Sequence, residues 1–175
     1  MTVMLALVTL ILAGCAPDGA GCAALALTPE QAERLAEARA VLDFDPVTPC
    51  GTGSAMGIGA VSVDRPDGTP RLTFTVEADG PLFLLSQSRS IRRFTQIPDG
   101  ASHLDWTVRG TAVRGFDSPA GLGPAVVYLR WERGGVWYEF QANPSARFPA
   151  PALHSLARLN IERTIEAERD AAGSH

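Results

Sequence analysis

The chain contains no lysine and few cysteines or histidines. All 15 basic residues are arginine, and only three cysteines and three histidines occur among 175 residues. The 19 acidic residues give a formal net charge of −4, so there is no basic excess of the kind that binds nucleic acid. His103, His154 and His175 have no metal-ligand spacing. We therefore expect no nucleic-acid partner, no metal and no other cofactor.

Motifs for nucleotide binding and hydrolysis are also missing. Gly51 and Gly53 form a G-x-G, but no Lys-Ser/Thr follows to complete a phosphate-binding loop. Ser54 lacks the G-x-S-x-G frame of a nucleophilic serine, and its candidate partners His103 and Asp105 are paired only in sequence. No segment marks a pair of carboxylates for glycoside hydrolysis. We predict that the protein is not an enzyme.

A short apolar run lies at the start of the chain. It extends from Val3 to Leu12, which is too short to span a bilayer as a helix but suits a signal peptide. The run ends in Leu12-Ala13-Gly14-Cys15, which resembles the cleavage box of bacterial lipoproteins. Met1-Thr2 has no basic residue, which departs from the usual signal pattern.

The lipoprotein resemblance implies where the protein works. Cleavage would make Cys15 the first mature residue, and its thiol would bear lipid. Each buried CH₂ contributes roughly 0.8 kcal/mol, so two or three acyl chains make a stable membrane anchor. The expected location is the periplasmic face of an outer membrane or the outer leaflet of the cell membrane. Residues 1–14 are then the signal peptide, and residues 15–27 are a tether.

Cys22 and Cys50 remain once Cys15 is assigned to lipid. An even pair of cysteines outside the cytoplasm usually forms a disulfide, and we expect one here. Closing this loop of about 29 residues stabilises the fold by roughly 3.6 kcal/mol in the chain-entropy account. The pair lacks C-x-x-C spacing, which argues against a redox or metal role.

Two helices are predicted at the ends of a single domain, residues 28–165. Thr28-Pro29-Glu30-Gln31 is a capping box with proline at the first helical position, and this helix should extend to about Leu42. Its apolar face consists of Ala32, Leu35, Ala38, Val41 and Leu42. A second helix should begin near Pro151, with a buried face of Leu153, Leu156, Ala157 and Ile161. Residues 166–175 are expected to form a flexible, charged tail.

Between the helices the apolar pattern has a period of two, which predicts an antiparallel sheet. The turn at Pro66-Asp67-Gly68-Thr69 joins strands at 59–65 and 71–78. It pairs Val63 with Leu72 and Val61 with Phe74 on the core face, and Asp64 with Arg71 on the other face. Further strands are expected at 82–87, 104–109 and 111–116.

Gly134-Gly135 marks the clearest hairpin, because two glycines favour a type I′ turn. It joins predicted strands at 125–133 and 136–142. The turn pairs residues across the two strands: Trp131 with Tyr138, Leu129 with Phe140, and Arg130 with Glu139. Since side chains alternate, Trp137 belongs to the face opposite Trp131. The expected fold class is α+β: a twisted antiparallel sheet of six to seven strands, built from meander hairpins, with an N-terminal and a C-terminal helix packed on one face.

A series of short motifs follows between Leu84 and Leu159. These are Leu84-Leu85-Ser86-Gln87-Ser88, Pro98-Asp99-Gly100-Ala101, Val108-Arg109-Gly110-Thr111-Ala112, the segment from Leu129 to Phe140, and Leu153-His154-Ser155-Leu156-Ala157-Arg158-Leu159. Their order resembles an extracytoplasmic family of unknown function, found at the C-termini of anti-sigma-factor-like membrane proteins and in some lipoproteins. The resemblance implies architecture only, with no catalytic residue and no role in transcription.

Two features are candidates for a binding surface. Arg89, Arg92 and Arg93 form the main basic cluster, which on an anchored protein could touch anionic headgroups or simply be a solvated face. Trp137 is an aromatic residue on the predicted outer face, unless a helix covers it.

These features together predict a lipid-anchored binding or sensory module of the bacterial cell envelope, without a catalytic step. Its partners would be the membrane, through lipidated Cys15, and an unknown envelope protein or small ligand. One alternative is an envelope carrier, in which the sheet curls around the helices and encloses a lipid or other apolar ligand. Another is an envelope hydrolase.

Overall fold

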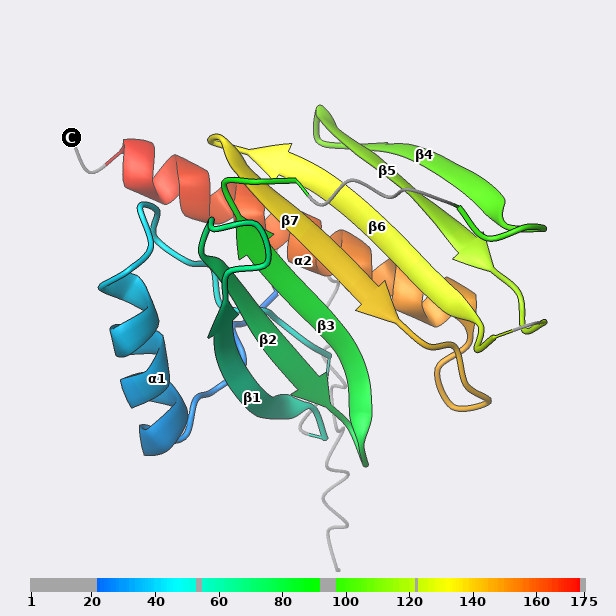
Figure 1. Ribbon diagram of the computed structural model, residues 1–175, viewed down its shortest axis with the longest axis horizontal. Helices are drawn as coiled ribbons and strands as arrows, with labels where there is room; N and C mark the ends of the chain where they lie inside the picture. The colour runs from blue at the N-terminus through cyan, green and yellow to red at the C-terminus, as the bar shows by residue number, and fades with distance from the viewer. Residues whose placement is uncertain (1–21, 53–54, 92–96, 122, 174–175) are drawn as a thin grey trace, which may run out of the picture.

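The computed structural model describes residues 22–52, 55–91, 97–121 and 123–173. Three predicted site residues, Cys15, Arg92 and Arg93, lie outside the described residues. In chain order the elements are α1 (Pro29–Arg39), β1 (Gly57–Asp64), β2 (Arg71–Glu77), β3 (Pro81–Ser88), β4 (Ser102–Val108), β5 (Thr111–Ser118), β6 (Val126–Arg133), β7 (Val136–Ala142) and α2 (Ala150–Ala172), as Figure 1 shows.

The strands form one antiparallel sheet in the order β1-β2-β3-β7-β6-β5-β4. The predicted α+β fold with six to seven strands is therefore confirmed. Most neighbours are joined by hairpins, but β3 pairs with β7. The connection from β3 to β4 consequently has to pass β7, β6 and β5 to reach the far edge of the sheet.

The predicted hairpin registers are confirmed. Across the Gly134-Gly135 turn the partners are Trp131 and Tyr138, Leu129 and Phe140, and Arg130 and Glu139. Across the earlier turn they are Val63 and Leu72, Val61 and Phe74, and Asp64 and Arg71. Both turns depend on glycines with positive φ, namely Gly68, Gly134 and Gly135.

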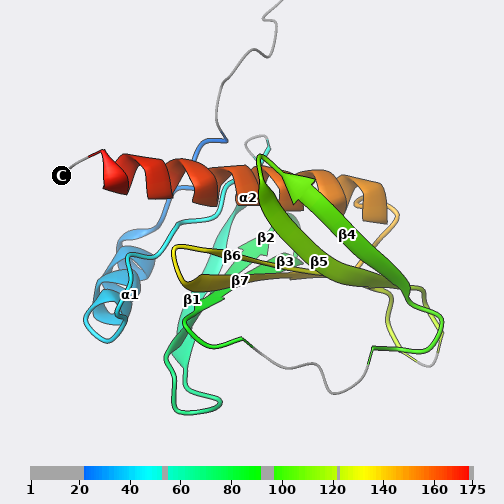
Figure 2. The same cartoon turned by 90° about the horizontal axis from the view of Figure 1, so that it is seen from above.

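Both helices lie on the same side of the sheet, which we call the helix-covered face (Figure 2). Leu35 and Ala38 of α1 belong to the same apolar core as Leu153 and Ile161 of α2. Residues of the helix-covered face alternate along each strand with those of the opposite face, as in Val136, Tyr138 and Phe140 of β7. The predicted arrangement of the two helices on one face is therefore present.

Helix α1 begins as predicted but is shorter and less buried than expected. The capping box at Thr28 and Gln31 is formed. The helix ends at Arg39, one turn early, and of its predicted apolar face only Leu35 and Ala38 are fully buried. Val41 is 45% exposed, and Val63 on β1 is 38% exposed, although both were predicted to be buried. The reason is shared, because both residues border an open hollow between the C-terminal half of α1 and β1.

Helix α2 is longer than expected. It buries the predicted residues Leu153, Leu156, Ala157 and Ile161. It then continues to Ala172, through part of the segment that we predicted as a flexible tail. Ala167 packs against the core there, and Glu166 and Glu168 form ion pairs with Arg109 and Arg133. Burial and ion pairing therefore hold this part of the segment as helix.

Large side chains fill the space between the sheet and α2. Trp131 is 1% exposed, and its indole Nε1 donates a hydrogen bond to Thr164 Oγ1 at 3.0 Å. The Trp131 ring stacks on Tyr138 with centroids 5.5 Å apart. Phe140 stacks on Phe83 beside this pair. The indole thus finds both packing and a hydrogen-bond partner in the core.

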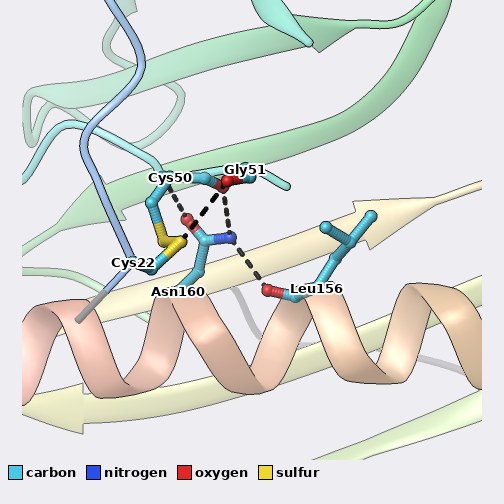
Figure 3. The surroundings of a disulfide bond; sticks show 5 residues. All are labelled: Cys22, Cys50, Gly51, Leu156 and Asn160. Carbon is cyan, nitrogen blue, oxygen red and sulfur yellow. Dashed lines mark hydrogen bonds between the residues drawn. A yellow bond between two sulfur atoms is a disulfide. The ribbon is translucent and has the colours of Figure 1, made fainter. Parts of the chain in front are cut away.

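The predicted disulfide between Cys22 and Cys50 is formed beside α2 (Figure 3). Asn160 of α2 binds the backbone of Cys50 on both sides: its Oδ1 accepts from the Cys50 amide at 3.0 Å, and its Nδ2 donates to the Cys50 carbonyl at 3.1 Å. Gln87 of β3 binds Val47 in the same way, at 2.9 and 2.6 Å. Two buried amides therefore fix the connection from α1 to β1, and with it the disulfide, on the helix-covered side.

Candidate binding face

Among the residues that the structure describes, no helix covers the opposite side of the sheet, and we call this side the helix-free face (Figures 1 and 2). One row of polar side chains crosses all seven strands on this face. Each member is the register partner of the next: Ser62, Thr73, Ser86, Glu139, Arg130, Arg114 and Asp105. We call this set the polar row. Its charged residues gather over β7, β6, β5 and β4, while hydroxyl groups occupy β1 to β3.

A hollow of about 460 Å³ opens beside the charged half of the polar row. Its floor is the stacked pair of Phe116 and Tyr128, with ring centroids 5.5 Å apart. Both residues are buried, at 6% and 4% exposure, although they lie on the helix-free face. Ile97 and Leu104 also line the hollow. Apolar surface beside charged groups is the usual composition of a small-ligand site.

Arg114 and Arg130 lie at the rim of this hollow on neighbouring strands, directly opposite each other. Like charges in that position repel. Glu139, the other register partner of Arg130, accepts a hydrogen bond from the Tyr128 hydroxyl at 2.8 Å. Among the residues that the structure describes, neither arginine forms an ion pair. Two guanidinium groups without an ion pair therefore lie beside these rings, and the carboxyl residues Asp105 and Glu139 are their other register partners.

Gly115 explains how the floor is built. A Cβ atom at this position would lie 1.9 Å from the Tyr128 carbonyl oxygen. Only glycine therefore lets β5 approach β6 this closely at the point where Phe116 stacks on Tyr128.

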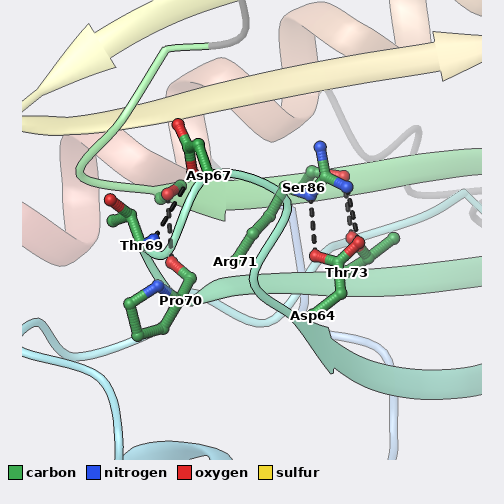
Figure 4. A network of polar contacts seen from close by, with 8 residues as sticks. Asp64, Asp67, Thr69, Pro70, Arg71, Thr73 and Ser86 are labelled. Carbon is green, nitrogen blue, oxygen red and sulfur yellow. Dashed lines mark hydrogen bonds and ion pairs between the residues drawn. The ribbon is translucent and has the colours of Figure 1, made fainter.

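The other half of the face is held by small polar contacts (Figure 4). Arg71 donates two hydrogen bonds to Asp64, from Nε at 2.9 Å and from Nη2 at 2.6 Å. The hydrogen bond with Asp64 raises the pKa of Arg71. Next to this pair the hydroxyl oxygens of Thr73 and Ser86 are 2.9 Å apart. This arrangement satisfies its own polar groups and offers less for a ligand to bind.

Of the predicted binding surface the structure describes Trp137 and Arg89, and their side chains make separate contacts. As predicted, Trp137 lies on the helix-free face, whereas Trp131 lies on the helix-covered face. The register partners of Trp137 are Ser88 and Glu132, and its side chain is half-buried. The Arg89 guanidinium instead donates to the carbonyl of Gly134, in the turn between β6 and β7, at 2.8 Å, and to the carbonyl of Asp43, in the α1 to β1 connection, at 3.0 Å. Arg89 therefore holds two loops together.

The two described histidines, His103 and His154, take part in separate contacts, while His175 lies outside the described residues. His103 lines the hollow. His154 of α2 lies 3.0 Å from Asp117 and packs edge-on against Trp106. Within the described residues there is no cluster of metal-ligating side chains, and no helix there is long and apolar enough to cross a membrane.

Sequence reasoning missed Arg114, Phe116 and Tyr128 as site residues. The pattern correctly paired Arg130 with Glu139, but the neighbour on its other side depends on β5 lying beside β6. A signal was present in the sequence, because Arg114 and Phe116 are two residues apart, as are Tyr128 and Arg130. In a strand this spacing places each arginine on the same face as an aromatic residue.

No protein-family model, curated protein or solved structure matches this chain. The family resemblance of residues 84–159 therefore stays a prediction. The function has to be inferred from the chemistry of the molecule itself.

Proposed function

We propose that the protein is a lipid-anchored binding or sensory module of the bacterial cell envelope, without a catalytic step. The membrane is one partner, through lipid on Cys15. The second partner, an envelope protein or a small ligand, binds on the helix-free face.

The observation that supports this proposal most is the short link between the lipoprotein motif and the fold. Cys15 precedes Cys22 by only seven residues. Seven residues span at most about 25 Å when fully extended. Cys22 itself is held against α2 by the disulfide to Cys50 and by Asn160. The fold is therefore tethered close to its anchor, from the helix-covered side.

The tether leaves the helix-free face pointing away from the membrane. Seven strands at about 4.8 Å spacing make a sheet roughly 30 Å wide, with a helix layer about 10 Å from it. In Figure 2 the described chain begins on the α2 side of the sheet. A partner in solution therefore meets the polar row and the hollow first.

The carrier alternative gains no support from the packing. An acyl-chain carrier needs an enclosed apolar chamber, whereas Trp131, Phe140 and Leu153 fill the space between the sheet and α2. The hydrolase alternative gains none either, because His103 and Asp105 have no described nucleophile beside them in the hollow.

Cell fractionation tests the proposal. Wild-type protein should pellet with membranes, and Cys15→Ser should move to the soluble extracytoplasmic fraction because it cannot be lipidated. The matched control is the double variant Cys22→Ser/Cys50→Ser, which removes the disulfide but leaves the anchor and should stay in the pellet. A Cys15→Ser protein that remains fully bound to membranes would contradict the proposal.

A further inference from the structure

We infer that a cleft beside the C-terminal half of α2 binds an anionic phosphate group. The cleft has a volume of about 610 Å³ and lies between α2, the connection from α1 to β1, and the turn between β6 and β7. Arg163 of α2, Arg133 of β6 and Tyr138 of β7 line it. The inference adds a second site to the proposed function, and it rests on that function only where it names the membrane as the source of the phosphate.

Unsatisfied hydrogen-bond donors are the first part of the argument. Among the residues that the structure describes, two buried side-chain polar atoms have no hydrogen-bond partner, and they are the Nε atoms of Arg133 and Arg163. Both arginines line this one cleft. Buried N–H groups in folded proteins are nearly always paired, so two unpaired groups beside one cleft indicate an acceptor that binds there.

The charge of Arg163 is the second part. The three other arginines of the cleft have carboxylate partners, in the pairs Arg39 with Asp45, Arg89 with Asp43, and Arg133 with Glu168. Within the described part of the chain, Arg163 forms neither an ion pair nor a side-chain hydrogen bond. Asp170 also lines the cleft, but no ion pair joins it to Arg163. Arg163 is therefore the guanidinium group that an anion in this cleft would bind.

The Tyr138 hydroxyl is a third donor at the cleft. Tyr138 is 4% exposed, and its hydroxyl makes no hydrogen bond with another described residue. Burial and, next, the charge of Glu168 raise its pKa to about 12, so at neutral pH the hydroxyl is protonated and can donate. Donors on α2, β6 and β7 suit a phosphate group, because its oxygens accept hydrogen bonds from several directions and arginine binds them well.

The position of the cleft favours a phosphate of the membrane. Thr48 lines the cleft, and Cys50, two residues further on, forms the disulfide with Cys22. Asn160, which binds the Cys50 backbone, precedes Arg163 by three residues, which is close to one turn of α2. The proposed tether therefore leaves the fold beside the cleft, and this brings phospholipid headgroups within reach of it.

The test uses full-length lipidated protein in dodecyl maltoside micelles, which contain no phosphate. Calorimetry measures the binding of glycerol 3-phosphate, a dissolved phosphate, and of dihexanoylphosphatidylglycerol, a lipid with a phosphate headgroup. Both should bind with one-to-one stoichiometry, and the lipid more tightly, because the micelle concentrates it beside the protein. Glycerol and dihexanoylglycerol lack the phosphate and should bind at least about tenfold more weakly.

Two controls accompany these titrations. Protein-free micelles give the heat of lipid partitioning. Mass spectrometry of acyl chains on Cys15 reports lipidation separately. Since glycerol 3-phosphate needs no anchor to reach the cleft, a failed anchor is distinguished from a failed phosphate site.

Variants assign the binding to the cleft. Arg163→Gln should weaken the binding of both phosphate probes about tenfold or more, because it removes the unpaired charge and the Nε donor. Tyr138→Phe removes one hydroxyl and should weaken it by a smaller factor, about threefold to tenfold. Arg158→Gln, on the exposed side of α2, removes the same charge elsewhere and should change neither affinity. Urea midpoints verify that each variant is folded.

The outcomes separate the site from the source of its phosphate. Lipid binding that requires Arg163 would identify a membrane headgroup as the source. Binding of glycerol 3-phosphate alone would retain the phosphate site but contradict the membrane as its source. The inference is overturned if neither phosphate probe binds, if the phosphate-free probes bind as tightly, or if Arg158→Gln loses as much affinity as Arg163→Gln.

Discussion

Trp131 with Tyr138 and Phe116 with Tyr128 are stacked aromatic pairs on opposite faces of the sheet, and the two pairs have different neighbours. On the helix-covered face Trp131 stacks on Tyr138, and on the helix-free face Phe116 stacks on Tyr128, each with ring centroids 5.5 Å apart. All four residues are less than 9% exposed. The first pair is enclosed by core side chains and by Thr164 of α2, whereas the second is bordered by Arg114 and Arg130.

This comparison shows that burial alone does not distinguish the covered face of the sheet from the open one. What differs is the charge beside each pair. A core excludes unpaired charge because burying it is costly, so the arginines beside Phe116 and Tyr128 mark that pair as part of an outer face. The predictions below test whether the helix-covered face supplies stability while the helix-free face supplies binding.

The largest expected effect separates the two tryptophans of the last hairpin. Trp131→Ala should destabilise the domain by about 3 to 5 kcal/mol, because it empties a fully buried site. Trp137→Ala should cost only about 1 kcal/mol, because that ring is half-buried on the helix-free face. Urea unfolding midpoints, at equal slopes, measure both. Equal or inverted losses would mean that the helix-free face is as structural as the core.

An intermediate effect concerns alkaline pH. Burial on the helix-covered face raises the pKa of Tyr138 to about 12. The folded state therefore holds this proton more tightly than the unfolded state, whose tyrosines titrate near 10. The stabilising contribution of this proton is complete below pH 10. It is lost between pH 10 and 12, which lowers the free energy of unfolding by about 2 to 3 kcal/mol.

Urea midpoints from pH 9 to 12 measure this loss, with Tyr138→Phe as the variant that should lack it. Tyr128→Phe on the helix-free face is the matched control and should keep the alkaline loss. If the urea midpoints of wild type and Tyr138→Phe fall equally between pH 10 and 12, Tyr138 is not responsible for the alkaline loss of stability.

The smallest effect is expected on the helix-free face. The coupling free energy between Arg71 and Asp64, measured by a double-mutant cycle to alanine, should be about 0.5 to 1 kcal/mol, because Asp64 is 55% exposed. Added salt should reduce it further. A coupling above 2 kcal/mol would mean that this face contributes to stability as strongly as the covered one.

The sequence allowed the local parts of the fold to be predicted, because turn chemistry determines them. Gly134-Gly135 fixed the pairing of Trp131 with Tyr138, and the capping box at Thr28 located the start of α1. The lengths of the helices were harder to predict from the sequence. Whether Val63 is covered depends on how far α1 runs over β1, which periodicity does not encode.

The candidate site could not be predicted, because it depends on strand neighbours that are distant in sequence. The hairpin alone placed Arg130 beside Glu139, but only the pairing of β5 with β6 places it beside Arg114. Asn160 and Gln87 gave a weaker signal, which could have been used to predict that their side chains bind backbone groups in the core. A lone amide on an otherwise apolar face indicates a backbone partner, here Cys50 and Val47.

The most direct test of the account is the orientation of the anchored domain. Energy transfer is measured from a dye at Ser155→Cys, on the exposed side of α2, and at Gln141→Cys, exposed on the helix-free face, to an acceptor on the headgroups of phosphatidylcholine vesicles. Labelling without reductant keeps the disulfide closed. The account predicts clearly higher transfer from position 155 than from position 141. Equal or reversed transfer would show that the helix-free face is not the side presented to partners.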